Sequence, residues 1–171
     1  MIQLVYWIDM PIAIRLSKIL LVVAVALIAT LIAWGNIVDY QSNLSYVAKI
    51  MSMDDIFAAS TLKWRAVQHP WLVHSAFLTI IVWECCIALL CWMGSVQALR
   101  ALRQNAAVFN ASKSLATLGL MLFLLLFAFV FMTIGGEWFA SWQSLQFNSI
   151  TASNTHFAFL GIILLLWLHA D

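Results

Sequence analysis

Charged side chains are scarce in this sequence: they make up 9% of the 171 residues, against roughly a quarter in soluble domains. Eight Lys and Arg face seven Asp and Glu, so the chain lacks the basic surface that nucleic-acid binding requires. Hydrophobic residues account for 65% of the chain and the mean hydropathy is +1.00. These values exclude a soluble globule and a disordered segment. The composition predicts an integral membrane protein.

Cysteine and catalytic motifs are also nearly absent. Cys85, Cys86 and Cys91 lie in one apolar run, and an odd number with two adjacent members suits neither a disulfide framework nor a zinc site. We interpret them as small apolar filler. The sequence has no His-Glu-x-x-His pair, phosphate-binding glycine loop, nucleophile elbow or paired carboxylates in one apolar run. It therefore indicates no enzyme, metal or cofactor.

Four apolar segments are long enough to cross a bilayer, which takes roughly 20 residues for about 30 Å of hydrocarbon. They cover about 19–38, 71–96, 115–135 and 150–169. Each must be helical, because a lone strand would leave its amide and carbonyl groups unpaired in lipid. The sequence predicts an all-α fold, with residues 1–171 forming a single membrane domain and a four-helix transmembrane bundle.

The first span has some features of a secretory signal, because Arg15 and Lys18 precede it. Its apolar run of about 20 residues exceeds the 7–15 that are usual for a signal, and no small-x-small cleavage site follows. We predict a retained helix. Residues 1–14 are interrupted by Pro11 and are expected to lie along the inner interface.

The distribution of cations predicts the orientation. They flank the first span and fill the link between the second and third spans: Arg15, Lys18, Arg100, Arg103 and Lys113. The positive-inside rule places both regions, and so both termini, in the cytoplasm of a multi-pass protein of the bacterial inner (plasma) membrane. Tryptophans, which favour the headgroup level, agree with this topology. The outer edge would hold Trp34, Trp71, Trp138 and Trp142, and the inner edge Trp7, Trp92 and Trp167.

Glu84 is the most unusual residue of the spans. It follows Trp71 by 13 positions, which places it about 20 Å along the helix and near the bilayer midplane. A central charge costs about 2.5 to 3.5 kcal/mol on insertion scales. The carboxyl is therefore expected to face the bundle interior and to be either protonated or paired.

Three interpretations of Glu84 remain open at this point. It could be a neutral carboxyl that hydrogen-bonds another helix, a site for a proton, cation or polar ligand, or a contact with another subunit. Partners of suitable type occur in the other spans: Thr30, Asn36, Thr117, Thr133 and His156.

Two histidines raise the question of haem or quinone binding. His74 and His156 each lie a few residues inside a span that enters from the outer side, so their imidazoles could share a depth. Such a pair can hold one haem iron between two helices. Hydrogen bonding to water or headgroups is the alternative.

The long outer link, residues 39–70, is predicted to be structured. An apolar stretch at 44–53 indicates a surface helix, and Asp54 and Asp55 then suit the N-terminus of a second helix near Ile56. Two cations, Lys63 and Arg65, flank Trp64 at the predicted end of that helix. Asp39 begins the link, which makes it part of the same outer cap.

The other outer link begins with Gly135 and Gly136, which we expect to end the third helix. Trp138 and Trp142 are four residues apart and are predicted to share a face of a helical turn at the headgroup level. Glu137 could serve as a charge at a helix N-terminus or pair with Lys63 or Arg65. Together the links would form a cap that docks a partner, covers a cavity above Glu84, or only shields helix ends.

A family resemblance rests on motifs spread over nearly the whole chain. They are Asn36-Ile37-Val38-Asp39-Tyr40 with Asn43, Ser52-Met53-Asp54, Trp64-Arg65-Ala66, Glu84, Gly135-Gly136-Glu137-Trp138-Phe139, Trp142-Gln143-Ser144 and Asn148. The pattern resembles a bacterial family of predicted small integral membrane proteins of unknown function. The resemblance implies an inner-membrane protein of four helices and no particular reaction.

The favoured hypothesis is a non-enzymatic accessory or structural subunit. Its partners would be membrane lipid and either further copies of the chain or a larger inner-membrane complex. The apolar surface, with small-residue faces such as Ala29 with Ala33, supports association. The alternatives are a proton- or cation-linked small-solute conduit that uses Glu84, and a haem or quinone anchor that uses His74 and His156.

Overall fold

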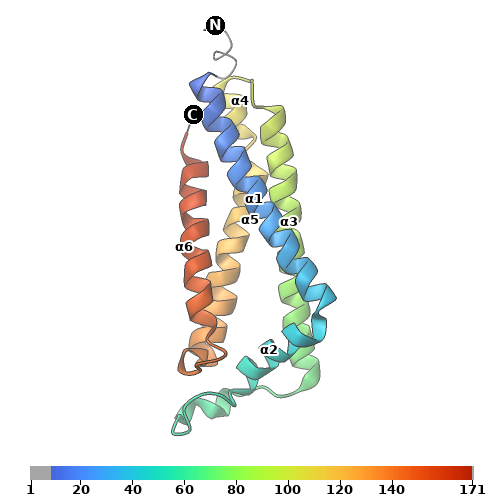
Figure 1. Cartoon of the computed structure of the whole chain (residues 1–171), viewed down its shortest axis with the longest axis vertical. Coiled ribbons are helices and arrows are strands. Elements are labelled where there is room, and N and C mark those ends of the chain that lie inside the picture. Colours follow the sequence, from blue (N-terminus) through green and yellow to red (C-terminus); the bar gives the residue numbers. More distant parts are fainter. Residues whose placement is uncertain (1–8, 171) are drawn as a thin grey trace, which may run out of the picture.

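The computed structural model describes residues 9–170, which form a bundle of four long antiparallel helices (Figure 1). The first is α1 (Met10–Val38), the second α3 (Pro70–Arg100) and the fourth α6 (Ser149–Leu168). The third runs from Ala106 to Trp138. All four are long and apolar enough to cross a membrane, and the described residues contain no strand. The predicted all-α fold with four membrane-spanning helices is confirmed.

The helices are longer than the predicted spans at several ends. The largest difference is in α1, which begins at Met10 and has Pro11 in its first turn. Proline is tolerated there because the amide hydrogen that it lacks would have no helical partner. The expectation of a separate interfacial segment is therefore wrong for residues 10–14, and residues 1–8 lie outside the described part of the chain.

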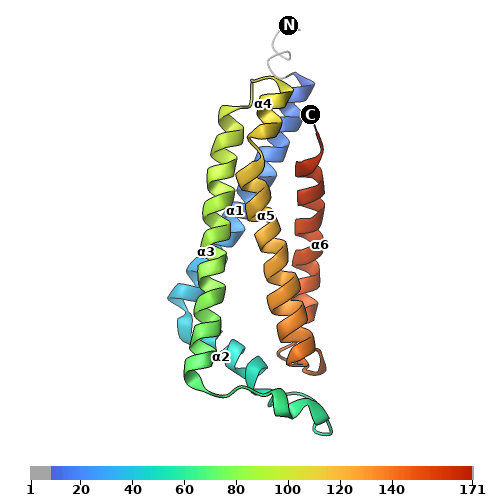
Figure 2. The ribbon, with the colours of Figure 1, turned by 180° about the vertical axis from the view of Figure 1, so that it is seen from behind.

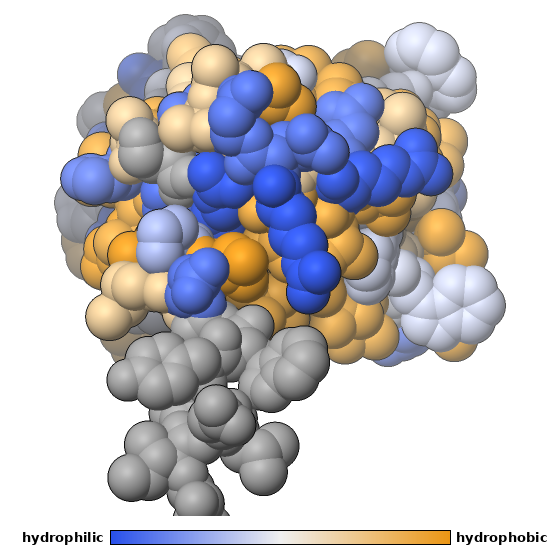
Figure 3. Space-filling view, turned by 90° about the horizontal axis from the view of Figure 1, so that it is seen from above, coloured by the Kyte–Doolittle hydropathy of each residue, from blue (hydrophilic) through white to orange (hydrophobic). Residues whose placement is uncertain are grey.

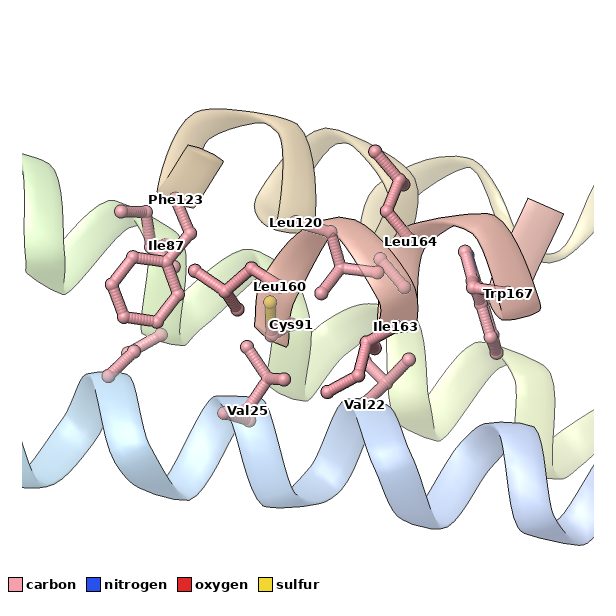
Figure 4. Close-up of a cluster of buried hydrophobic side chains, with 14 of the residues drawn as sticks. Val22, Val25, Ile87, Cys91, Leu120, Phe123, Leu160, Ile163, Leu164 and Trp167 are labelled. Atoms are coloured by element: carbon pink, nitrogen blue, oxygen red, sulfur yellow. The ribbon is translucent and has the colours of Figure 1, made fainter. Parts of the chain in front are cut away.

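The core lies where α1, α3, α6 and the third helix converge (Figure 4). Its side chains come from all four helices: Val22, Val25, Ile87, Cys91, Leu120, Phe123, Leu160, Ile163, Leu164 and Trp167. Ala29 and Ala33 are buried within the same chain. The small-residue face that was expected to support association is therefore already used inside the bundle.

The third long helix changes its hydrogen-bonding pattern along its length. It comprises α4 (Ala106–Ala111), α5 (Ser114–Leu125) and the π-helix η2 (Leu126–Trp138). In η2 the backbone repeat is i to i+5, a geometry that is rare in proteins. The hydroxyl of Thr133 follows the same spacing, donating to the carbonyl of Ala128 at 2.8 Å.

The predicted helix break at Gly135 and Gly136 is wrong. Both lie inside η2, where α6 begins close by: a Cβ on Gly136 would meet the Ile150 side chain at 2.5 Å. These glycines thus serve close approach between helices. The turn comes at Ala140, whose φ is +52°, and Trp142 then belongs to a separate 3₁₀ turn, η3 (Ser141–Gln143). Trp138 and Trp142 do not share one helical turn.

Three buried cations gather at the end of the bundle where α1 begins and α6 ends, here called the terminus end. Arg15 donates to the carbonyls of Leu102 and Gln104 at 2.8 and 2.6 Å. Lys18 and Lys113 both donate to the carbonyl of His169, at 2.7 and 3.0 Å. Figure 3 shows hydrophilic residues across this end. Cations at the last carbonyls of α6 also complement its helix dipole.

Trp167 lies at this end but not at its surface. It is 1% exposed, and its indole donates to the Thr117 hydroxyl at 3.0 Å. Its indole therefore points into the bundle, although the residue lies in the last turn of α6. Four exposed tryptophans belong to the opposite end, where α1 and η2 end, α3 begins and η3 lies: Trp34, Trp71, Trp138 and Trp142.

The two links at the opposite end form a structured layer, here called the cap (residues 39–69 and 139–148). The first link contains α2 (Tyr40–Ser52) and the 3₁₀ helix η1 (Thr61–Arg65). Figure 2 shows α2 crossing beneath the point where α3 diverges from η2. The second cap helix thus begins at Thr61, not near Ile56. Its N-cap is Ser60, which accepts from the amide of Leu62, not Asp54 or Asp55.

Candidate functional site

Glu84 faces the bundle interior, as the sequence predicts, and is 2% exposed. It accepts a hydrogen bond from the side-chain amide of Asn36 on α1, with 2.7 Å between Nδ2 and Oε2. This contact is of the kind expected for a carboxyl that joins two helices. It directly links α3 to the last turns of α1.

The other residues considered as partners of Glu84 bond elsewhere. Thr30 donates to the carbonyl of Ala26 on its own helix and accepts from the Trp92 indole. Thr117 donates to the carbonyl of Lys113. Thr133 bonds within η2, and His156 bonds within α6. Asn36 is the residue that the packing selects.

The two histidines belong to different neighbourhoods. His74 bonds the Tyr40 hydroxyl through Nδ1 at 2.9 Å and stacks on the Tyr40 ring. His156 bonds the carbonyl of Ala152 and stacks on Phe127, with 4.8 Å between ring centroids. No ring contact or hydrogen bond joins the two imidazoles within residues 9–170. The structure does not bring them together as a pair.

Polar contacts join the two links of the cap. The Ser144 hydroxyl bonds the Asp55 carboxylate, and the backbone amide of Phe57 donates to the Gln143 side-chain oxygen at 3.2 Å. The Phe57 ring meets the Trp142 ring edge-on at 6.0 Å. Beneath these contacts lies an apolar cluster that draws on both links: Ile50, Met53, Ile56, Phe139 and Ala140.

Arg65 of the cap packs against two tryptophan rings that also contact each other, Trp64 in the cap and Trp138 at the end of η2. Its guanidinium carbon is 5.3 Å from the Trp64 ring centroid and 4.7 Å from that of Trp138. Cation–π contacts of this kind favour arginine over lysine. Its Nη1 also donates to the carbonyl of Trp138 at 3.3 Å. In the described chain no ion pair joins Glu137 to Lys63 or Arg65, so the suggested pairing is wrong.

The remaining predicted cap residues have local roles. The Asp39 carbonyl accepts from the backbone amide and side chain of Asn43. Asp54 accepts from Ser52 at 2.8 Å and lies 3.9 Å from the Lys49 ammonium. Lys63 is exposed.

A cavity of about 450 Å³ lies between α3 and η2 on the cap side of the bundle. Its wall is almost wholly apolar, and α2 and Phe139 close it toward the cap. Residues from four elements line it: Tyr46, Val47, Ile50, Met51, Ala76, Thr79, Ile80, Trp83, Val130, Phe131, Ile134, Gly135, Phe139 and Ser149. Burial raises the pKa of the Tyr46 hydroxyl. Glu84 is not part of this wall, although Ile80, one turn earlier on α3, is. The cavity thus lies on the cap side of Glu84 without including it.

Two features were missed by the sequence analysis. The buried cations Arg15 and Lys18 were used there only to orient the chain, although their i, i+3 spacing on one helix face could have indicated a shared role. The cavity has no sequence signal, because it depends on how far α3 diverges from η2. Within the part of the chain that the structure describes, no three His, Cys, Asp or Glu residues are grouped to hold a metal.

The comparisons with known proteins give one family. Residues 14–170 match the family described as "predicted small integral membrane protein (DUF2165)". No curated protein and no solved structure matches the chain.

Proposed function

This chain belongs to that family of predicted small integral membrane proteins, and from this premise we propose that it is a non-enzymatic accessory or structural subunit of a membrane assembly. It associates with itself or with a larger complex of the membrane, and the cap provides the contact. The observation that carries the proposal is the set of large apolar side chains that the cap leaves exposed: Phe57, Trp64, Trp142 and Leu145.

These side chains project from a rigid support. The cap core holds both links together, and Arg65 fixes Trp64 against Trp138. Trp64 is nevertheless 73% exposed. Exposed aromatic groups on an ordered surface are typical of interaction sites, because they contribute much of the binding energy at low cost in conformational entropy.

The two alternatives receive less support. A conduit that uses Glu84 needs a polar path, yet Glu84 is bonded to Asn36 and does not line the cavity. A haem or quinone anchor needs His74 and His156 close together, and each is engaged by a different aromatic neighbour. The accessory role is therefore the proposal that the geometry favours.

The proposal places the protein in the bacterial inner membrane, with both termini in the cytoplasm and the cap outside. Its support is the cation-rich terminus end. In intact cells, a membrane-impermeant maleimide is expected to label Leu145→Cys but not Gln104→Cys, in a background with the three natural cysteines replaced by alanine. If Gln104→Cys is labelled and Leu145→Cys is not, the protein has the opposite orientation, and this part of the proposal is wrong.

Association can be tested by purification from native membranes in mild detergent. The wild-type chain is expected to migrate above monomer mass, and the double variant Trp64→Ala with Trp142→Ala to lose roughly 5- to 30-fold in affinity, since aromatic hot spots are worth about 1 to 2 kcal/mol or more. Two differently tagged copies distinguish self-association from a second polypeptide.

The matched control is Leu89→Ala, which removes an exposed side chain within α3. Association is expected to survive this change. A chain that migrates only as a free monomer contradicts the proposal, and association that is lost in Leu89→Ala but kept in the cap variant contradicts the role of the cap.

A further inference from the structure

We infer that the cavity between α3 and η2 is a binding site for one acyl chain of a membrane phospholipid, with the lipid phosphate at the level of Arg65. The inference does not depend on the accessory role proposed above. It rests on the chemistry of the cavity wall, on its depth in the bundle, and on the position of the polar groups around it.

The size and wall of the cavity suit an apolar chain. Its volume of about 450 Å³ lies in the range typical of small-molecule sites, roughly 300 to 1,000 Å³. Leucine-, isoleucine- and phenylalanine-lined cavities stay dry, because a buried water needs two to four polar partners. An empty cavity of this size would leave its wall without dispersion contacts. An apolar ligand needs no polar partners and restores the dispersion contacts of the wall.

The depth of the cavity matches the acyl region of one leaflet. Along α3 its wall runs from Ala76 to Trp83, which is about 9 to 20 Å from the start of the helix at 1.5 Å per residue. Half of the hydrocarbon layer is about 15 Å thick. Trp83 is held at the deep end because its indole donates to the carbonyl of Leu122 at 3.1 Å. The first turn of α3 carries Trp71, which is expected at the headgroup level, so the hydrocarbon begins a few ångströms along the helix. An acyl chain of the leaflet on the cap side then reaches the depth of the cavity.

The polar groups lie toward the cap, where a lipid headgroup would be. Tyr46 and Ser149 line the cap side of the cavity. The positive charge of Arg65 is anchored to the carbonyl of Trp138, the residue before Phe139, which forms part of the wall. A phosphate group complements this charge. A polar end and an apolar deep end match the polarity of a phospholipid.

The test uses the full chain in phosphatidylcholine vesicles with a trace of phosphatidylglycerol that carries a photoreactive diazirine in one acyl chain. Crosslinks are expected to concentrate on residues 76–83 and 130–135. Ala76→Phe fills the cavity and is expected to lower these crosslinks about tenfold or more. Cys85→Phe also introduces a phenyl ring, but on another face of α3 and outside the wall, and is expected to leave them unchanged.

Further arms identify the ligand and guard against misfolding. Arg65→Gln is expected to weaken crosslinking of the phospholipid but not that of a photoreactive isoprenoid alcohol. Crosslinks of the wild-type chain spread evenly over the outer faces of all four helices would overturn the inference, whatever the fate of the variants. Equal loss in Ala76→Phe and Cys85→Phe, or stronger crosslinking of the isoprenoid than of the phospholipid, would also overturn it.

Discussion

Replacement of Gly94 by leucine is expected to separate α3 from α5 and to lower the free energy of unfolding by about 3 kcal/mol or more. A Cβ on Gly94 would lie 2.3 Å from the backbone nitrogen of Ala116 and 2.6 Å from its Cα. Backbone atoms cannot rotate away as a flexible side chain would, so the helices must move apart. Small residues allow such close backbone approach in membrane proteins.

The measurement is unfolding of the detergent-solubilised chain by sodium dodecyl sulfate, followed by circular dichroism. Gly161→Ala is the matched control, because a Cβ there meets no atom within 4 Å. Alanine in a helix is favoured over glycine by up to about 1 kcal/mol, so this variant is expected to be as stable as the wild type or slightly more so. Equal stability of Gly94→Leu and wild type would contradict the close contact.

Replacement of Asn36 by leucine is expected to cost about 1 to 3 kcal/mol, because the buried Glu84 carboxyl then loses its donor. The double variant Asn36→Leu with Glu84→Leu is expected to recover most of this loss, since removal of both partners leaves no unsatisfied group. Unfolding of the wild type, the two single variants and the double variant completes a double-mutant cycle.

Asn43→Leu is the control for this cycle, because the Asn43 amide bonds only nearby backbone carbonyls and does not contact Glu84. A coupling energy near zero between positions 36 and 84 would show that the hydrogen bond does not join α1 to α3. A separate variant, Glu84→Gln, tests the conduit hypothesis: ion flux into proteoliposomes that is unchanged from that of the wild type would end it.

The four spans could be predicted because the length of an apolar run is a local property of the chain. The last span, predicted at 150–169, is found at Ser149–Leu168. The interior orientation of Glu84 followed in the same way from the cost of exposing a carboxyl to lipid. The hydrogen-bond partner of Glu84 could not be predicted in this way, because only the packing of α1 on α3 selects Asn36 among five residues of suitable type.

The cap shows where local patterns are insufficient. Asp54 and Asp55 resemble a helix N-terminus, but Asp55 bonds Ser144 in the other link, and Ser60 takes the capping role. Gly135 and Gly136 resemble a helix end, but their lack of side chains is used where α6 packs against η2. In each case a contact distant in the sequence decides between two structures that the local sequence allows equally.

The shared bonds of Lys18 and Lys113 to the His169 carbonyl have a consequence for the order of assembly. The ribosome produces α6 after the other three helices, so this acceptor reaches the two ammonium groups late. Long cationic side chains without it can extend to the aqueous boundary. The two ammonium groups thus gain their shared acceptor only when the final helix arrives, and that helix then ties α1 to the third long helix at this end.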